Sequence, residues 1–303
     1  MGYVCGYRQQ PSDPQHMCTA FNPAKTSPAS WDAFRDVEAF VDAVLAELAA
    51  MAADGTRRTR SGPKPPLTGA ALRKAIMAIW CVCFCGMQWL AIGQLCDIPF
   101  GTLYTLFARW TRLGLWHRLL NRLILAWRQA CGDKSIPSAV IIDSRSCRSA
   151  PTCFTRGFDG GKKIKGIKVH LAVDKYGFPL AITVSPANVH DSRGIVPVLH
   201  QLAGRGFKGT ALGDLSYRGQ RLSKAGKALG ITVEPSAGGH GGTFIPEGIR
   251  WVVERSLAWI SRYRRLNTIF ERTEGHLVAF VEIAFVSILS RPLVRLVTHE
   301  ISA

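Results

Sequence analysis

The stretch SAVIIDS, residues 138–144, organises the second half of this chain. It is a short run rich in β-branched residues that follows Pro137 and carries one carboxylate, Asp143, at its end, a pattern that predicts a buried strand. An acid at the end of such a strand is a common way to hold a metal ligand at the rim of a sheet, although many strands end in Asp only to begin a turn. Two later carboxylates, Asp214 and Glu254, lie at the ends or edges of predicted elements, so we expect the three acids to converge.

From residue 138 onward the sequence alternates between strand and helix patterns. Strands are predicted at 138–142, 165–173, 178–184, 209–213 and 231–234. Helices are predicted at 191–203, 220–229, 249–263 and 274–297, with a glycine loop at 236–243. This order matches a ribonuclease-H-like fold, which has three strands, a helix, a strand, a helix, a strand and final helices. We therefore predict an α/β catalytic domain over 138–297, with a mixed five-stranded sheet flanked by helices.

The first half has a helical pattern. Residues 1–29 show no hydrophobic periodicity and are expected to form a flexible arm, and a basic linker is expected near 56–66 (TRRTRSGPKPP). The region 30–132 is predicted to be an all-α DNA-binding region. Two short helices there, joined by a tight turn near 97–99, indicate a helix-turn-helix-like unit, although such pairs also occur in plain bundles. Its second helix carries the candidate DNA contacts Tyr104, Arg109 and Arg112.

Charge and cysteine content narrow the class of protein. Lys and Arg number 38 against 21 Asp and Glu, a formal net charge of +17 over 303 residues, which favours a polyanionic partner, nucleic acid before an anionic membrane surface. The nine cysteines are odd in number and never spaced as C-x-x-C, which argues against structural zinc and a disulfide framework.

The apolar run 75–93 approaches the length of a membrane span but is interrupted by Gly86 and Gln88, so no membrane partner is expected. The expected location is the cytoplasm, at the nucleoid.

The three acids suit metal-dependent phosphodiester chemistry. Hard divalent cations prefer carboxylate oxygen, and three converging carboxylates are the minimum for a two-Mg²⁺ site, with Mn²⁺ as a plausible substitute. Glu254 stands on an otherwise basic helix face, where a lone acid is either a metal ligand among phosphate-binding arginines or a salt-bridge partner. The basic residues around it are Arg250, Arg262 and Arg265.

Other polar residues have competing interpretations. Lys162, Lys163, Lys165 and Lys168 form either a DNA-facing patch or a solvated edge. Asp174 is interpreted as a hairpin-turn residue. Asp191 is expected to cap the helix that follows it, with a proton-donor role beside His190 as the alternative.

Several motifs carry a family resemblance. The segments are IIDSRS around Asp143, GFDGGKKIKGIKVHLAVDKYGFPLAITVSPANVHDS at 157–192, LGDLSYRG around Asp214, RWVVERSLAWISRYRRL at 250–266 and, more weakly, the run from residue 62. Together they resemble a bacterial DDE transposase of the insertion-sequence-five family. The chain departs from that pattern at Glu247, where the family has tyrosine. It departs again at Ser261, where the family has a basic residue, although Arg262 follows directly in this chain.

The resemblance implies an enzyme that binds the terminal inverted repeats of an insertion sequence in double-stranded DNA. It would cut those ends and join them to target DNA with Mg²⁺, as a homodimer or larger assembly on DNA. Asp143, Asp214 and Glu254 take the three catalytic, metal-binding positions, and Arg250 takes the arginine position four residues before the glutamate. Two alternatives remain open: a catalytically silent DNA-binding repressor derived from a transposase, and a ribonuclease-H-like nuclease.

Overall fold

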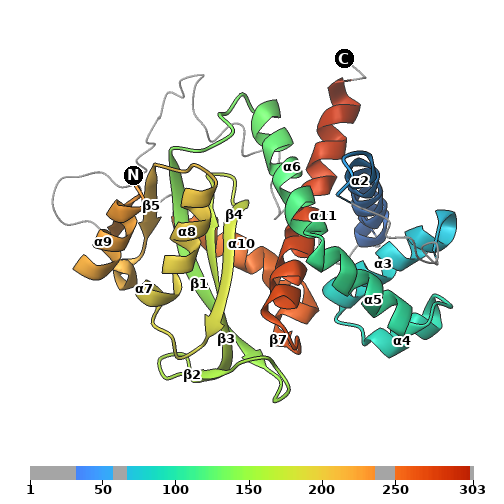
Figure 1. Cartoon of the computed structure of the whole chain (residues 1–303), viewed down its shortest axis with the longest axis horizontal. Helices are drawn as coiled ribbons and strands as arrows, with labels where there is room; N and C mark the ends of the chain where they lie inside the picture. The colour runs from blue at the N-terminus through green and yellow to red at the C-terminus, as the bar shows by residue number, and fades with distance from the viewer. Residues whose placement is uncertain (1–31, 57–66, 236–249, 301–303) are drawn as a thin grey trace, which may run out of the picture.

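The computed structural model describes residues 32–56, 67–235 and 250–300. The expected arm, nearly all of the basic linker and the glycine loop lie outside these ranges. The described chain consists of a sheet with its helices and a group of helices beside it (Figure 1). The helices of the first half are α2 (Asp32–Ala53), α3 (Gly69–Cys85), α4 (Trp89–Leu95), α5 (Phe100–Arg112) and α6 (Leu115–Ala130).

The sheet is mixed and has seven strands, two more than the sequence indicated. The strands are β1 (Ala139–Ser149), β2 (Gly157–Asp159), β3 (Ile164–Val173), β4 (Pro179–Pro186), β5 (Thr210–Gly213), β6 (Thr232–Pro235) and β7 (Thr268–Ile269). Their order is β2-β3-β1-β5-β6, with β4 paired to β3 and β7 paired to β1. β1 is antiparallel to β3 but parallel to β5 and β7, so it is the centre of the sheet. The predicted α/β class with a mixed sheet flanked by helices is confirmed.

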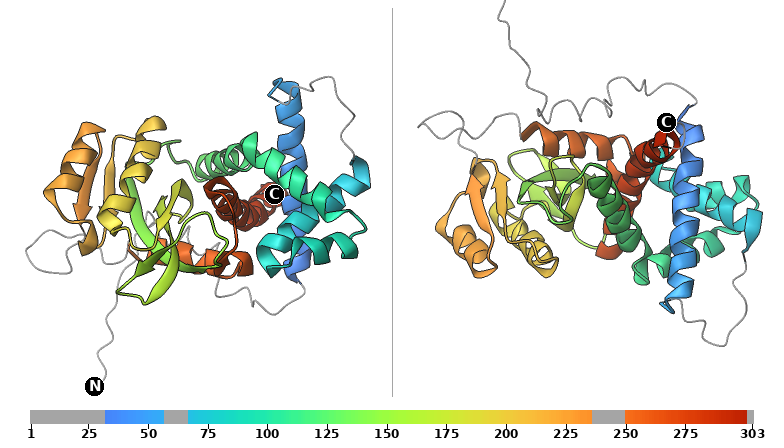
Figure 2. Two further views of the ribbon diagram at one scale, coloured as in Figure 1. Left: turned by 60° about the horizontal axis from the view of Figure 1, so that its bottom comes forward. Right: turned by 90° about the horizontal axis from the view of Figure 1, so that it is seen from above.

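Helices cover both faces of this sheet. They are α7 (Asp191–Gly194), α8 (Val196–Gly204), α9 (Gln220–Ala228), α10 (Arg250–Ser261) and α11 (Glu274–Glu300), with short 3-10 turns η1 (Leu215–Tyr217) and η3 (Arg264–Leu266). Seen from above, α10 lies along one face and α7 and α8 lie on the other (Figure 2). The single helix predicted at 191–203 is divided at Ile195, just before Val196 and Pro197 begin α8.

The side chains of β1 divide the core into two layers. Ile141 and Cys147 join the hydrophobic cluster that also contains α10, α11 and the helices of the first half. Val140 and Ile142 join a smaller cluster with α8 and α9. Alternate residues of a strand point to opposite faces, so odd-numbered side chains of β1 face α10 and even-numbered ones face α7 and α8.

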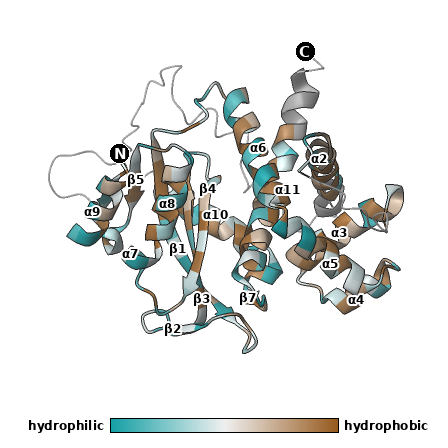
Figure 3. Cartoon of the chain, viewed as in Figure 1, coloured by the Kyte–Doolittle hydropathy of each residue, from teal (hydrophilic) through white to brown (hydrophobic). Residues whose placement is uncertain are grey.

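Helix α11 connects the two parts of the molecule. It packs against α2, α3, α5, α6 and β4, and its middle is largely hydrophobic while α9 is largely hydrophilic (Figure 3). The segment Glu274–Leu293 is long and apolar enough to span a membrane, but 72% of its most apolar window is buried within the protein. Its hydrophobicity is therefore explained by its central position in the fold. The apolar run at 75–93 does not form one helix, because α3 ends at Gly86 in a left-handed conformation, with φ +71°.

The hairpin turn between β3 and β4 is anchored to the helical part. The Asp174 carboxylate accepts hydrogen bonds from the backbone N–H groups of Tyr176 and Phe178, which confirms its predicted role in the turn. Asp174 is fully buried and also forms an ion pair with Arg128 of α6, with 2.8 Å between Oδ2 and Nη1. The sequence offered no indication of this partner.

Candidate active site

Asp143 and Asp214 lie close together at the neighbouring strands β1 and β5. The ladder between β1 and β5 pairs Val140 with Ala211 and Ile141 with Leu212. Continuing this parallel register by two residues on each strand places Asp143 beside Asp214, immediately after β5 ends. Residues two apart on a strand share a face, so the Asp143 carboxylate lies on the face that α10 covers. Asp214 is close enough for its charge to raise the pKa of Asp143. The predicted approach of these two acids therefore follows from the strand pairing.

Asp143 is not at the end of its strand, as the sequence suggested. It lies within the eleven-residue strand β1, opposite Leu171 of β3, because β1 continues to Ser149. Its carboxylate is largely buried and accepts a hydrogen bond from the Ser144 N–H, with 2.7 Å between Oδ1 and N. Burial raises the pKa of Asp143 to about 6, and the nearby charge of Asp214 adds to the rise, while the Ser144 N–H opposes it.

Asp214 is oriented by the turn that follows it. It is the N-cap of η1, and its Oδ1 accepts the Ser216 N–H at 2.8 Å and the Ser216 hydroxyl. This leaves the second carboxylate oxygen, Oδ2, without a hydrogen bond to Ser216. Tyr217, the last residue of η1, is buried. Burial raises the pKa of its hydroxyl, and the charges of Asp143 and Asp214 act in the same direction.

The pair fits a hard divalent cation. The pKa of Asp143 is raised mainly by burial and further by the charge of Asp214, and a cation bound between the two carboxylates would offset both effects. Within the described residues, however, no group of three His, Cys, Asp or Glu side chains is close enough to hold a metal ion. The third predicted acid, Glu254, is exposed on α10, the helix that covers the same face. Its convergence with the other two remains a prediction.

Helix α10 is fixed to the sheet through its inner side. The Ser256 hydroxyl donates to the Gly177 carbonyl at 2.8 Å, and Arg255 Nη2 donates to the Tyr176 carbonyl at 2.9 Å. The Arg255 guanidinium also lies over the rings of Trp251 and Trp259. These contacts fix the rotation of the helix about its axis, and the Glu254 side chain is exposed.

The predicted DNA contacts fall into different environments. Exposed side chains are found at Lys162, Lys163 and Lys165 of the β2–β3 hairpin, and at Arg262, Tyr104 and Arg112. Arg109 is half-buried. Arg265 instead forms an ion pair with the buried Glu271, with 2.7 Å between Nε and Oε1, which holds η3 against the residues before α11. The side chain of Arg250 lies outside the described part.

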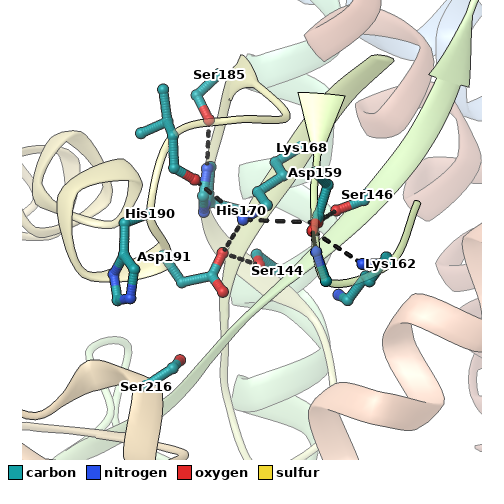
Figure 4. Close-up of polar contacts among 12 residues, drawn as sticks. Ser144, Ser146, Asp159, Lys162, Lys168, His170, Ser185, His190, Asp191 and Ser216 are labelled. Carbon is teal, nitrogen blue, oxygen red and sulfur yellow. Dashed lines mark hydrogen bonds and ion pairs between the residues drawn. The ribbon is translucent and has the colours of Figure 1, made fainter. Parts of the chain in front are cut away.

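Lys168 is buried rather than part of an exposed lysine patch. It is surrounded by polar side chains on the sheet face opposite Asp143, together with His170 and Asp191 (Figure 4). The sequence contained a signal for this polar face, because Lys168 and His170 alternate with Ile167, Val169 and Leu171 along β3.

The prediction that Asp191 caps the helix that follows it was wrong. The N-cap of α7 is His190, whose Nδ1 accepts the Ser192 N–H at 3.3 Å. The Asp191 carboxylate instead turns inward, where it accepts the Ser144 hydroxyl at 2.7 Å and lies 3.0 Å from Lys168 Nζ.

Residues 134–233, which contain both paired aspartates, match the family model described as Transposase DDE domain. This stretch is similar to the DDE domains of transposases. The match ends before Glu254, so it covers the strands that lead to Asp143 and Asp214 but not the third predicted acid. The resemblance to bacterial DDE transposases is thereby confirmed for this stretch, whereas the assignment to the insertion-sequence-five family stays a prediction.

A curated relative shows the same similarity. A Burkholderia cepacia protein named "Putative transposase for insertion sequence element IS402" is 32% identical over 128 residues. The aligned part is 39% of this chain and 60% of the relative, so the chain spans less than two thirds of the protein that it matches.

Proposed function

We propose that this chain is a DNA transposase that binds the terminal inverted repeats of an insertion sequence and carries out metal-dependent DNA cleavage and strand transfer. The observation that carries the proposal is the adjacency of Asp143 and Asp214 within a stretch that is similar to the DDE domains of transposases. The mixed sheet with helices on both faces is consistent with the ribonuclease-H-like architecture of such a domain.

Asp143 and Asp214 would hold the metal, with Glu254 of α10 completing the site. Two bound Mg²⁺ ions, or Mn²⁺ in their place, would stabilise the attacking and leaving oxygens of a phosphodiester displacement. The chain itself orients the ligands: the Ser144 N–H holds one carboxylate and the Ser216 N–H holds the other. Because Asp143 is partly buried, few water molecules would compete with its carboxylate for a bound cation.

Exposed basic residues supply the DNA-binding surface in this proposal. The β2–β3 hairpin presents Lys162, Lys163 and Lys165 to solvent, and Arg262 is exposed beyond the end of α10. Lysine and arginine neutralise backbone phosphates without reading sequence. Recognition of the repeats would fall to the bent pair α4 and α5, whose axes differ by 115° and whose second helix exposes Tyr104.

Two element ends must be held together for cutting and joining, so we propose a homodimer or a larger assembly on DNA. We also place the protein in the cytoplasm, at the nucleoid, where its DNA substrate lies. The net charge of +17 supports binding to a polyanion.

The test is cleavage and strand transfer on a supercoiled plasmid carrying candidate element ends. With Mg²⁺ the native protein should nick the ends and join them to target DNA, and Asp143→Ala, Asp214→Ala and Glu254→Ala should each abolish both steps while retaining DNA binding. Glu234→Gln is a matched control, because Glu234 pairs with Leu212 and so lies on the same sheet face, one strand further from β1. Full strand transfer by Asp143→Ala would refute the proposal.

The same assay separates the alternatives. Binding to the ends without any nicking under Mg²⁺ or Mn²⁺ would favour a silent repressor. Cleavage of structured DNA without joining would favour a ribonuclease-H-like nuclease.

A further inference from the structure

A connected set of polar side chains lies on the sheet face opposite the paired aspartates, and Lys168 is its centre (Figure 4). The Lys168 side chain is only 8% exposed. Its Nζ lies 3.0 Å from Asp191 Oδ1 and 3.8 Å from Asp159 Oδ2, and it donates to the Val189 carbonyl at 3.0 Å. One ammonium group therefore joins β3 to the β2–β3 hairpin and to the loop before α7.

Two arms extend from Lys168 to β1. In the first, Asp191 accepts a hydrogen bond from the Ser144 hydroxyl at 2.7 Å. In the second, Asp159 accepts one from the Ser146 hydroxyl at 2.6 Å. The two serines are on the same strand and the same face, and they are 6% and 7% exposed.

Only the first arm reaches the candidate metal site. Ser144 contacts Asp191 through its hydroxyl on one face and donates its backbone N–H to the Asp143 carboxylate, whose side chain points to the other face. The contacts Lys168, Asp191, Ser144 and Asp143 thus form one continuous chain through the sheet. The second arm ends at the hairpin tip and, among the residues that the structure describes, makes no hydrogen bond to Asp143, because the other oxygen of Asp159 accepts the N–H groups of Gly161 and Lys162, each at 3.1 Å.

Asp143 lies in a section of β1 where such support matters. In the described part of the chain, the ladder with β5 ends at Ile141 and the ladder with β7 begins at Arg148. Between these points β1 is paired along one edge only, with β3. A strand that is paired along one edge only has more freedom to twist. The hydrogen bond from the Ser144 hydroxyl to Asp191 therefore restrains β1 where it has no second neighbouring strand.

We propose that Ser144 and Asp191, held by Lys168, are positioning residues that fix the Asp143 carboxylate for binding a divalent cation. The inference rests on the proposed function, since it takes Asp143 as a metal ligand. Outer partners that orient a ligand commonly change metal affinity by 10–100-fold when they are removed, so the effect is large enough to measure. Lys168 is a poor residue to substitute, because its loss would leave two carboxylates without their cation.

The two serines provide a matched experiment. Ser144→Ala and Ser146→Ala each remove one hydroxyl of equal burial that donates to a carboxylate paired with Lys168. Mn²⁺ alone would be titrated by calorimetry into the metal-free full chain. Ser144→Ala should weaken Mn²⁺ binding about tenfold or more, Ser146→Ala should leave it within about twofold, and both should lower the thermal unfolding midpoint to a similar extent.

A double-mutant cycle tests the order of contacts. If Asp191 acts through Ser144, Asp191→Asn should weaken Mn²⁺ binding in the native background and have little further effect in Ser144→Ala. Equal Mn²⁺ affinities for Ser144→Ala and Ser146→Ala, or fully additive effects in the cycle, would overturn the inference. Asp143→Asn separates this failure from that of the proposed function: unchanged Mn²⁺ affinity in Asp143→Asn would refute the metal site itself.

Discussion

Replacing Asp143 by Asn should stabilise the metal-free protein at neutral pH. The folded protein holds the pKa of Asp143 at about 6, above its ordinary value of 3.8, so the ionised carboxylate is disfavoured in the fold. A raised carboxyl pKa contributes stability below the unfolded pKa and loses it as pH rises through the folded pKa. The amide keeps the size and the Oδ1 acceptor for the Ser144 N–H without the charge. The expected gain is about 0.5 kcal/mol near pH 4 and about 3 kcal/mol near pH 8.

The assay is urea unfolding of both proteins in a chelating buffer at a series of pH values. The difference in unfolding free energy should grow between pH 4 and 7 and then level off. Saturating Mg²⁺ should reduce or reverse it at pH 8, since only the native carboxylate binds the cation. Asp191→Asn is the control and should have the opposite effect. Burial raises the pKa of Asp191, but the Ser144 hydroxyl and Lys168 outweigh burial and leave the pKa lowered. This variant should therefore be less stable than the native protein at neutral pH.

Two outcomes would refute the reasoning. A difference between Asp143→Asn and the native protein that does not change with pH would show that the carboxylate is not electrostatically disfavoured. A loss of stability at pH 8 in the chelating buffer would show that the charged form is stabilised by groups other than a metal.

The remaining predictions concern packing. Arg128→Met should destabilise the fold by about 3–5 kcal/mol in urea unfolding at pH 7, because it leaves the buried carboxylate of Asp174 without its cation. Gly194→Ala should destabilise by roughly 1–3 kcal/mol, since a Cβ at this position would lie 2.3 Å from atoms of the His170 ring. A native-like unfolding midpoint for either variant would contradict the contact on which it depends.

Each of these changes has a control on the surface. Lys175→Met breaks the exposed ion pair with Asp133 and should cost at most about 1 kcal/mol. Gly101→Ala adds a Cβ to a helical position with no neighbour within 4 Å and should stabilise by about 0.5–1 kcal/mol.

Local patterns in the sequence were sufficient for much of the second half of the fold. The β-branched run at 138–142, the alternation along β3 and the turn DKYG at 174–177 each depend on neighbours within a few residues. The sequence also predicted that Asp143 and Asp214 lie close together, because each follows a short apolar strand; the parallel pairing of those strands is seen only in the structure. The brief strands β2 and β7 were missed, since strands of two or three residues have no period to detect.

By itself, the sequence determined the α/β class, the carboxylate on the central strand and the basic character that indicates a nucleic-acid partner. Only the tertiary structure decided that β1 continues past Asp143, that Asp191 turns inward to Ser144, and that Lys168 is buried between two acids. The physical reason is the distance along the chain between the partners. A strand ends where its neighbouring strands stop pairing with it. Whether a carboxylate caps a helix or pairs with a lysine depends on which element packs against it. Local sequence patterns contain neither piece of information.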